Sequence, residues 1–158
     1  MEQEVDVAII GAGSAGLYAM SQVSHRTDSF VLLDGGELGT TCARIGCMPS
    51  KALIQVADDF HRREMFARMG IEGGEGLSVN GADVLEHVQN LRDIFVDKVL
   101  SSSTDNMGEN FIAENARFIA PGLLETESRR IRAKSVVIAA GSAPVVPSSW
   151  RSFGERVL

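Results

Sequence analysis

The chain has 158 residues, a length that favours one domain large enough to bury a substantial hydrophobic core. Its 15 Lys and Arg residues against 21 Asp and Glu residues give a formal net charge of −6, so no extended basic face is available for a phosphate backbone. The composition, 44% hydrophobic and 23% charged, is typical of a soluble globular protein rather than a disordered or fibrous one. Nucleic acid is therefore not an expected partner.

The apolar stretch over residues 7–20 predicts neither a secretory signal nor a membrane span. No Lys or Arg precedes it, three glycines interrupt it, and it is shorter than the ~20 apolar residues that a membrane helix needs. An Arg-rich transit segment is also absent, and two cysteines are too few for a secreted disulfide framework. We therefore expect a cytoplasmic protein that does not associate with membranes.

The first 33 residues predict a strand, a helix and a second strand. Glu4–Ile10 is a short apolar run with β-branched residues, Ser14–Val23 is apolar without proline, and Phe30–Leu33 is apolar again. A right-handed crossover makes the two strands neighbours in one parallel sheet, with the helix covering a face.

The middle of the chain predicts a loop and two helices. Gly35–Gly39 forms the loop, and a helix with an irregular start is expected from Gly46 to about Met69. Residues 70–81 contain five glycines and predict a surface excursion. A long helix follows, because one apolar stripe recurs at helical spacing: Val84, Val88, Leu91, Phe95 and Val99.

From residue 110 the pattern favours strands. We expect a small β-meander inserted into the sheet, made of Asn110–Ile112, Ala116–Ile119, Leu123–Thr126 and Arg130–Arg132. Ser135–Ala140 predicts a further buried parallel strand, and Gly141 follows its carboxyl end, where open α/β sheets bind ligands. The predicted fold class is therefore α/β, with a parallel sheet, a helical cover and a meander.

Gly11–Gly16 reads G-x-G-x-x-G between the first predicted strand and its helix. In this context the glycines provide a tight turn, a close approach of backbone to pyrophosphate, and close packing of helix on strand. The helix start supplies free N–H groups and a partial positive charge. Asp34 follows Gly16 by 18 residues, at the end of the second strand, where an acid accepts hydrogen bonds from a ribose diol. We predict a dinucleotide site in a Rossmann-like domain; the alternative is an ordinary α/β turn with a solvated aspartate.

Cys42 and Cys47 are five positions apart, which in a regular helix separates their Cα atoms by roughly 8 to 9 Å, beyond the ~7 Å limit for a disulfide. Gly46 permits the distortion that a bond requires, and a helix starting there places Cys47 where a thiolate is favoured. A stabilising disulfide would contribute only about 2 kcal/mol across so short a loop. A structural zinc site needs four ligands, and the sequence places no histidines together to complete one with the two cysteines. The three histidines are scattered singly: His25, His61 and His87. A redox dithiol is favoured and no metal is expected.

The string over residues 39–51, GTTCARIGCMPSK, resembles the redox-active signature of the flavin-dependent pyridine nucleotide disulfide oxidoreductases. The order of the glycine loop, the acid, the cysteine pair, the long helix and the meander is similar to that family. Residues 137–144, VIAAGSAP, are similar to the family's A-T-G-S-x-P. The resemblance covers residues 5–147.

The resemblance implies that FAD binds this domain and that the two cysteines exchange electrons with it. By that resemblance Cys47 lies against the flavin and forms a thiolate–flavin charge-transfer pair, and Cys42 is the interchange thiol that meets the substrate disulfide. Lys51 lies near the reactive nitrogen of the flavin. Two adjacent thiols beside an electron acceptor pass two electrons between a dithiol and a nicotinamide. The implied FAD contacts are Gly11, Gly13, Ser14, Ala15 and Gly16 for the pyrophosphate, Asp34 for the ribose, and Gly36, Thr41, Cys42, Lys51, Ala116, Ala140 and Gly141.

Three residues depart from the family's usual pattern: Asp34 stands for glutamate, Thr40 for glycine and Ala140 for threonine. We expect a looser ribose contact and small shifts in the FAD fit. Family members also continue into nicotinamide-binding and dimerisation domains, which these 158 residues do not contain. We therefore expect residues 1–158 to be the amino-terminal part of an FAD-binding domain, inactive alone.

The resemblance implies a complete homodimeric enzyme that passes electrons between a small dithiol and NAD or NADP. Dihydrolipoamide with NAD is the favoured pair. The alternatives are an enzyme like glutathione reductase or mercuric reductase, which share the cysteine signature, and a non-catalytic module that binds a nucleotide or senses redox state.

Overall fold

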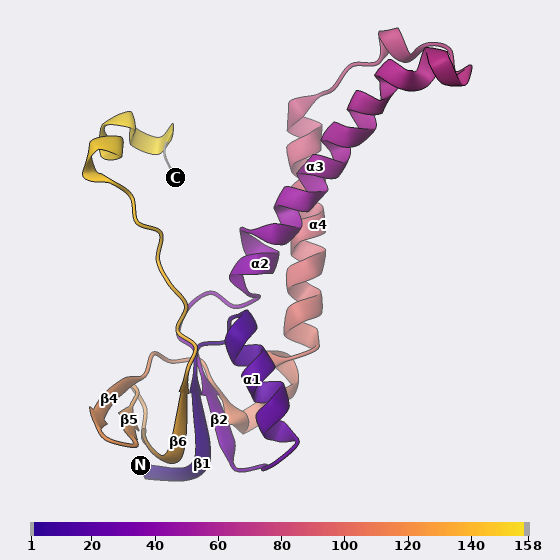
Figure 1. Ribbon diagram of the computed structural model, residues 1–158. Coiled ribbons are helices and arrows are strands. Elements are labelled where there is room, and N and C mark those ends of the chain that lie inside the picture. The colour runs from indigo at the N-terminus through magenta and orange to yellow at the C-terminus, as the bar shows by residue number, and fades with distance from the viewer. Residues whose placement is uncertain (1, 157–158) are drawn as a thin grey trace.

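The computed structural model describes residues 2–156, which form a sheet with one covering helix and a pair of long helices that extend away from it (Figure 1). The six-stranded sheet has the order β3-β2-β1-β6-β5-β4. Its centre is parallel, because β1 (Glu2–Ile10) pairs in parallel with both β2 (Phe30–Leu33) and β6 (Arg130–Ile138). Helix α1 (Ser14–Ser24) connects β1 to β2, so the predicted β-α-β unit is confirmed.

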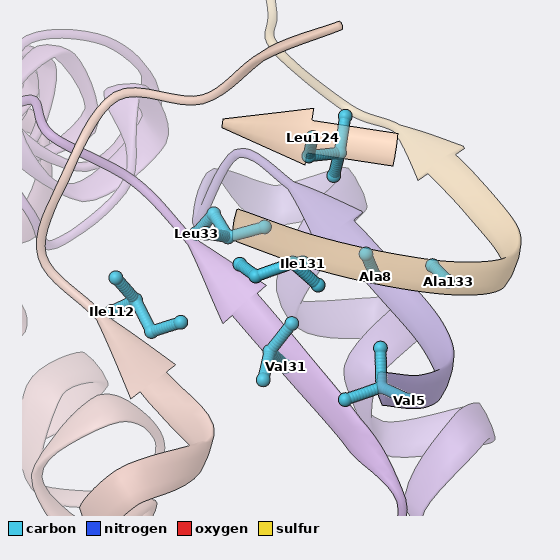
Figure 2. Close-up of a cluster of buried hydrophobic side chains, with 8 residues drawn as sticks. All are labelled: Val5, Ala8, Val31, Leu33, Ile112, Leu124, Ile131 and Ala133. Carbon is cyan, nitrogen blue, oxygen red and sulfur yellow. The ribbon is translucent and has the colours of Figure 1, made fainter. Parts of the chain in front are cut away.

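The hydrophobic core lies on both faces of this sheet, because side chains alternate along each strand. In β2, Val31 and Leu33 join one cluster, and Phe30 and Leu32 join the other. Figure 2 shows the first cluster, in which Leu124 reaches in from the meander to side chains of the parallel strands. The second cluster is covered by α1 through its half-buried apolar residues, Leu17, Ala19, Met20 and Val23.

The meander does not contain all of the strands that were predicted for it. Strands β4 (Arg117–Ala120) and β5 (Leu123–Glu125) are antiparallel and extend the sheet beyond β6. The predicted strand Asn110–Ile112 is instead β3 (Phe111–Ile112), which pairs in parallel with β2 at the opposite edge. Its assignment to the meander was wrong, because so short a run carries no signal of its partner.

The prediction of separate strands at Arg130–Arg132 and Ser135–Ala140 was also wrong, since β6 runs without a break and ends at Ile138. Ile131 and Val136 pack into the same core cluster, so the alternation of faces shifts by one residue between them. Because of that shift and the two charged side chains at 132 and 134, the sequence pattern of one continuous strand looks like two strands joined by a turn. Each charge pairs with β1 instead: Arg132 Nε lies 2.8 Å from Glu2 Oε1, and Lys134 Nζ lies 2.6 Å from Asp6 Oδ1.

The two long helices, α3 (Cys47–His61) and α4 (Gly81–Ser101), pack against each other (Figure 1). The side chain of Asn80 caps α4 by accepting a hydrogen bond from Ala82 N at 3.1 Å. The predicted apolar stripe of α4 is confirmed, with Val88 buried and the other four members half-buried. Short elements complete the described chain: α2 (Thr41–Arg44) and five 3₁₀ segments, η1 (Arg62–Met69), η2 (Gly74–Gly76), η3 (Thr104–Asn106), η4 (Gly108–Asn110) and η5 (Ser148–Arg156).

The helix predicted to reach about Met69 is α-helical only to His61 and continues as the 3₁₀ segment η1. A helix often tightens in this way near its end, and here it stops at Gly70 in the left-handed conformation, with φ of +76°. No helix within residues 2–156 combines the length and hydropathy that spanning a membrane requires.

Glu114, just before β4, makes the stability of the fold depend on pH. Hydrogen bonds from Ser128 and Thr126, with the positive charge of Arg129, lower its pKa from 4.5 to about 2. Because the folded pKa is lower, the ionised form stabilises the fold above pH 4.5, and this contribution is lost as the pH falls toward about 2. We expect the free energy of unfolding of Glu114→Gln, from urea titrations, to fall less steeply over that range. Equal slopes for both proteins would contradict this role.

Candidate active site

Two of the loop glycines are required by close backbone packing at the carboxyl ends of β1 and β6. Gly11 has φ of +104°, and a Cβ there would collide with the carbonyl of Ala139. A Cβ on Gly16 would collide with the carbonyl of Gly11. The loop is held between the strands by hydrogen bonds from Gly11 N to Leu33 O at 2.7 Å and from Ala139 N to Ile10 O at 2.7 Å.

The third glycine faces open space. A Cβ on Gly13 would meet no atom within 4 Å, and the loop residues Ser14 and Ala15 are exposed. Gly13 is the N-cap of α1, and no described side chain caps that helix end. A pyrophosphate binds where the backbone can approach it closely and where the positive end of a helix dipole faces it. The open space at Gly13 and the free N–H groups at the start of α1 meet both requirements.

Asp34 lies beside this loop at the end of β2. Its Oδ2 accepts a hydrogen bond from Ala12 N at 2.6 Å, and its Oδ1 accepts one from Gly36 N at 2.8 Å. Each carboxylate oxygen has a further lone pair for a ligand hydroxyl. The acid therefore also ties the glycine loop to the loop after β2, a contact that the sequence pattern did not predict.

Two other segments meet the same place. A Cβ on Gly35 would lie 2.6 Å from Asn115 N, which puts the residue before Ala116 against the loop after β2. Ala139, which contacts Gly11, is followed directly by the exposed Ala140 and Gly141. The structure thus brings together the predicted cofactor residues of the glycine loop, Asp34, Gly36, Ala140 and Gly141. Asn115 was missed because it belongs to no motif, and Ala139 was missed as a contact although it belongs to the VIAAGSAP string.

The cysteines lie on either side of a break between two helices. Cys42 is in α2, Cys47 is the first residue of α3, and the backbone leaves helical geometry at Ile45 and Gly46. A Cβ on Gly46 would lie 3.0 Å from Thr41 O, so the second helix starts close against the first. This is the distortion that the spacing required, and it places Cys47 close enough to Cys42 to raise the pKa of the Cys42 thiol. Both cysteines are free.

The two thiols are in different environments, since Cys47 is exposed and Cys42 is half-buried. The hydrogen bond with Cys47 raises the pKa of the Cys42 thiol, and burial raises it further, while the positive charge of Lys51 acts in the opposite direction. Lys51 is therefore near Cys42. Within residues 2–156 no group of three or more His, Cys, Asp or Glu residues is placed to hold a metal ion.

Thr40, just before α2, has an unusual backbone conformation. Its φ of 64° and ψ of 146° belong to a region that is essentially reserved for glycine. This strain falls on the turn that carries Cys42, a feature that the sequence pattern did not predict. Figure 1 shows α2 and the start of α3 beyond the carboxyl ends of the central strands, the end of the sheet at which the glycine loop lies.

A sequence profile of the family described as pyridine nucleotide-disulphide oxidoreductase matches residues 5–153. The chain belongs to this family. The chain is 27% identical to the dihydrolipoyl dehydrogenase of Staphylococcus aureus, over 98% of its own length and 33% of that relative's. It is 25% identical to the mercuric reductase of Lysinibacillus sphaericus, over 92% of its length and 27% of the relative's.

A solved structure supports the fold of this chain. It is the Cu(II) complex of the HOCl-induced flavoprotein disulfide reductase RclA from Escherichia coli, with a TM-score of 0.65, 21% identity, and coverage of 90% of this chain and 29% of that one. The Rossmann-like α/β fold class is confirmed. The chain spans about a third of the length of the curated relatives. FAD and NAD(P) are the cofactors of the family, and the open glycine loop, the uncapped helix start and the exposed Cys47 fit FAD.

Proposed function

We propose that the chain is the amino-terminal part of the FAD-binding domain of a homodimeric enzyme that passes electrons between dihydrolipoamide, or a similar small dithiol, and NAD. The observation that carries the proposal is the pair of adjacent free thiols at the α2–α3 break. The curated relatives, about three times as long as this chain, supply the expectation of further domains. In this proposal the 158 residues do not turn over alone.

The proposed cofactor site combines the groups described above. The pyrophosphate of FAD lies on Gly11–Gly16, with its ribose on Asp34 and further contacts from Gly36, Ala116, Ala140 and Gly141. The flavin ring of FAD would be held by the residues around the cysteine pair, Thr41, Cys42, Cys47 and Lys51. When bound, the flavin would accept and donate two electrons there. What supports this assignment is the meeting of three backbone segments at the glycine loop.

The surroundings of the two thiols support different roles. When Cys42 and Cys47 are joined as a disulfide, a substrate thiolate attacks Cys42, the S–S bond breaks, and Cys47 leaves as a thiolate. Cys47 is at the amino terminus of the 15-residue α3, where negative charge is stabilised, so it is the better leaving group. The second substrate thiol then attacks the mixed disulfide. Cys42 leaves and takes up a proton, which its raised pKa favours.

The mercuric reductase relative favours one alternative within the same family, a metal-ion reductase that uses the same thiol pair. The two activities are separated by assaying the complete enzyme for NAD reduction by dihydrolipoamide and for NADPH oxidation by Hg²⁺. The substrate proposal fails if only the second reaction proceeds. A non-catalytic module would show neither reaction.

Alkylation tests the proposed cofactor position in the chain itself. We expect iodoacetamide to label the exposed Cys47 before the half-buried Cys42, whose raised pKa keeps its thiol protonated. Added FAD should slow the labelling of Cys47 at least about tenfold, because the flavin covers it. Mass spectrometry of peptides from timed reactions measures both rates. The Gly13→Ala variant is the control, since weak FAD binding there should leave Cys47 unprotected. Equal labelling with and without FAD in the native chain would contradict the position of Cys47.

A further inference from the structure

Arg44, the last residue of α2, binds the preceding loop at three points. Its backbone N donates to Thr40 O at 3.0 Å, and its Nη1 donates to Glu37 O at 3.1 Å. Its guanidinium also forms an ion pair with the carboxylate of Glu37. The Arg44 side chain is only 24% exposed. A guanidinium fork that binds a carbonyl and a carboxylate of one residue defines the position of both segments.

The loop closed in this way is under strain. Within residues 2–156, Thr40 is the one non-glycine residue with positive φ, and it stands beside Gly39, whose φ is +103°. A Cβ on Gly39 would lie 2.7 Å from Val96 on α4 and 3.5 Å from Arg44 Cδ, so the loop is confined between that helix and the arginine stem. Thr40 Oγ1 accepts a hydrogen bond from Ala43 N at 3.2 Å. Such a conformation persists only where the surroundings hold it.

Cys42 lies inside the segment that these contacts close, two residues after Thr40 and two before Arg44. We propose that Arg44 is a positioning residue for the dithiol: its fork on Glu37 holds Thr40 in the strained conformation that keeps Cys42 beside Cys47. This inference rests on the proposed function, in which the two sulfurs form and break a bond. Without the fork, Thr40 relaxes to negative φ and α2 moves, so Cys42 and Cys47 meet less often.

The test is the equilibrium between the Cys42–Cys47 dithiol and its disulfide in the full 158-residue chain, in buffers of reduced and oxidised glutathione. The two thiols lose two protons and two electrons and form one S–S bond, while one glutathione disulfide is reduced to two thiols. We expect Arg44→Gln to lower the equilibrium constant about tenfold. Arg44→Lys should lower it similarly, because an ammonium group keeps the charge but loses the fork.

Relief of the strain distinguishes positioning from a general loss of stability. Thr40→Gly, which adopts positive φ without strain, should leave the equilibrium constant near the native value, and the double variant Thr40→Gly/Arg44→Gln should recover to within about threefold of it. Arg132→Gln, which removes an ion pair at β1 and β6, is the matched control and should change nothing. A double variant as impaired as Arg44→Gln, or an Arg44→Gln protein with the native constant, would overturn the inference. A native chain that forms only mixed disulfides with glutathione would overturn the proposed function itself.

Discussion

Turnover of the dithiol substrate is expected to fall at least about a thousandfold when Cys42 is replaced by serine in the proposed complete enzyme. A serine hydroxyl forms no disulfide, so the substrate thiolate has no sulfur to attack. Cys47 remains at the start of α3 in this variant. The long-wavelength absorbance that a thiolate gives with a flavin should therefore persist. Steady-state NAD reduction and a visible spectrum of the same sample measure the two effects.

Cys47→Ser is the matched variant and should give the opposite spectroscopic result. It removes the thiol that we place against the flavin, so both the long-wavelength band and turnover should be lost. If Cys42→Ser retained turnover, or if it lost the band while Cys47→Ser kept it, the roles of the two cysteines would have to be exchanged or abandoned.

The second large effect is expected at Gly16, where alanine should lower the free energy of unfolding by about 3 kcal/mol and abolish FAD binding. The added Cβ would collide with the carbonyl of Gly11, which is backbone and cannot rotate away. The start of α1 would have to move from β1, and its N–H groups would lose their position. Thermal unfolding and quenching of flavin fluorescence measure the two consequences.

Gly13→Ala separates the cofactor role of the loop from its packing role. Gly13 has φ of −74°, and a methyl group added there would meet no atom within 4 Å, so alanine should leave the melting temperature unchanged. The methyl group would stand where the pyrophosphate approaches the backbone, and FAD affinity should fall at least about tenfold. Native affinity in this variant would place the pyrophosphate elsewhere.

The glycine loop and the cysteine turn were predictable from the sequence because local geometry dictates them. A tight strand-to-helix turn requires glycine where backbones touch, as at Gly11 and Gly16. Two cysteines at this spacing approach each other only if the helix breaks, and Gly46 marked the break. In each case one short stretch of chain contains both the requirement and the residue that meets it.

Features that depend on distant partners were not predictable in this way. The continuity of β6 depends on Glu2 and Asp6 in β1, which neutralise Arg132 and Lys134 across the sheet. The position of β3 in the sheet depends on its pairing with β2, and nothing in the short sequence Phe111–Ile112 indicates that partner. The strain at Thr40 appears only when the loop is placed against α4 and the Arg44 fork.

The central claim, that Cys47 faces bound FAD as one half of a redox pair, is tested most directly by a visible absorption spectrum. The purified chain is mixed with FAD, freed of unbound flavin, and recorded anaerobically before and after one equivalent of a dithiol. Bound flavin that develops a long-wavelength thiolate band on reduction is the result we predict. Bound flavin that bleaches or stays unchanged without this band would contradict the placement of Cys47.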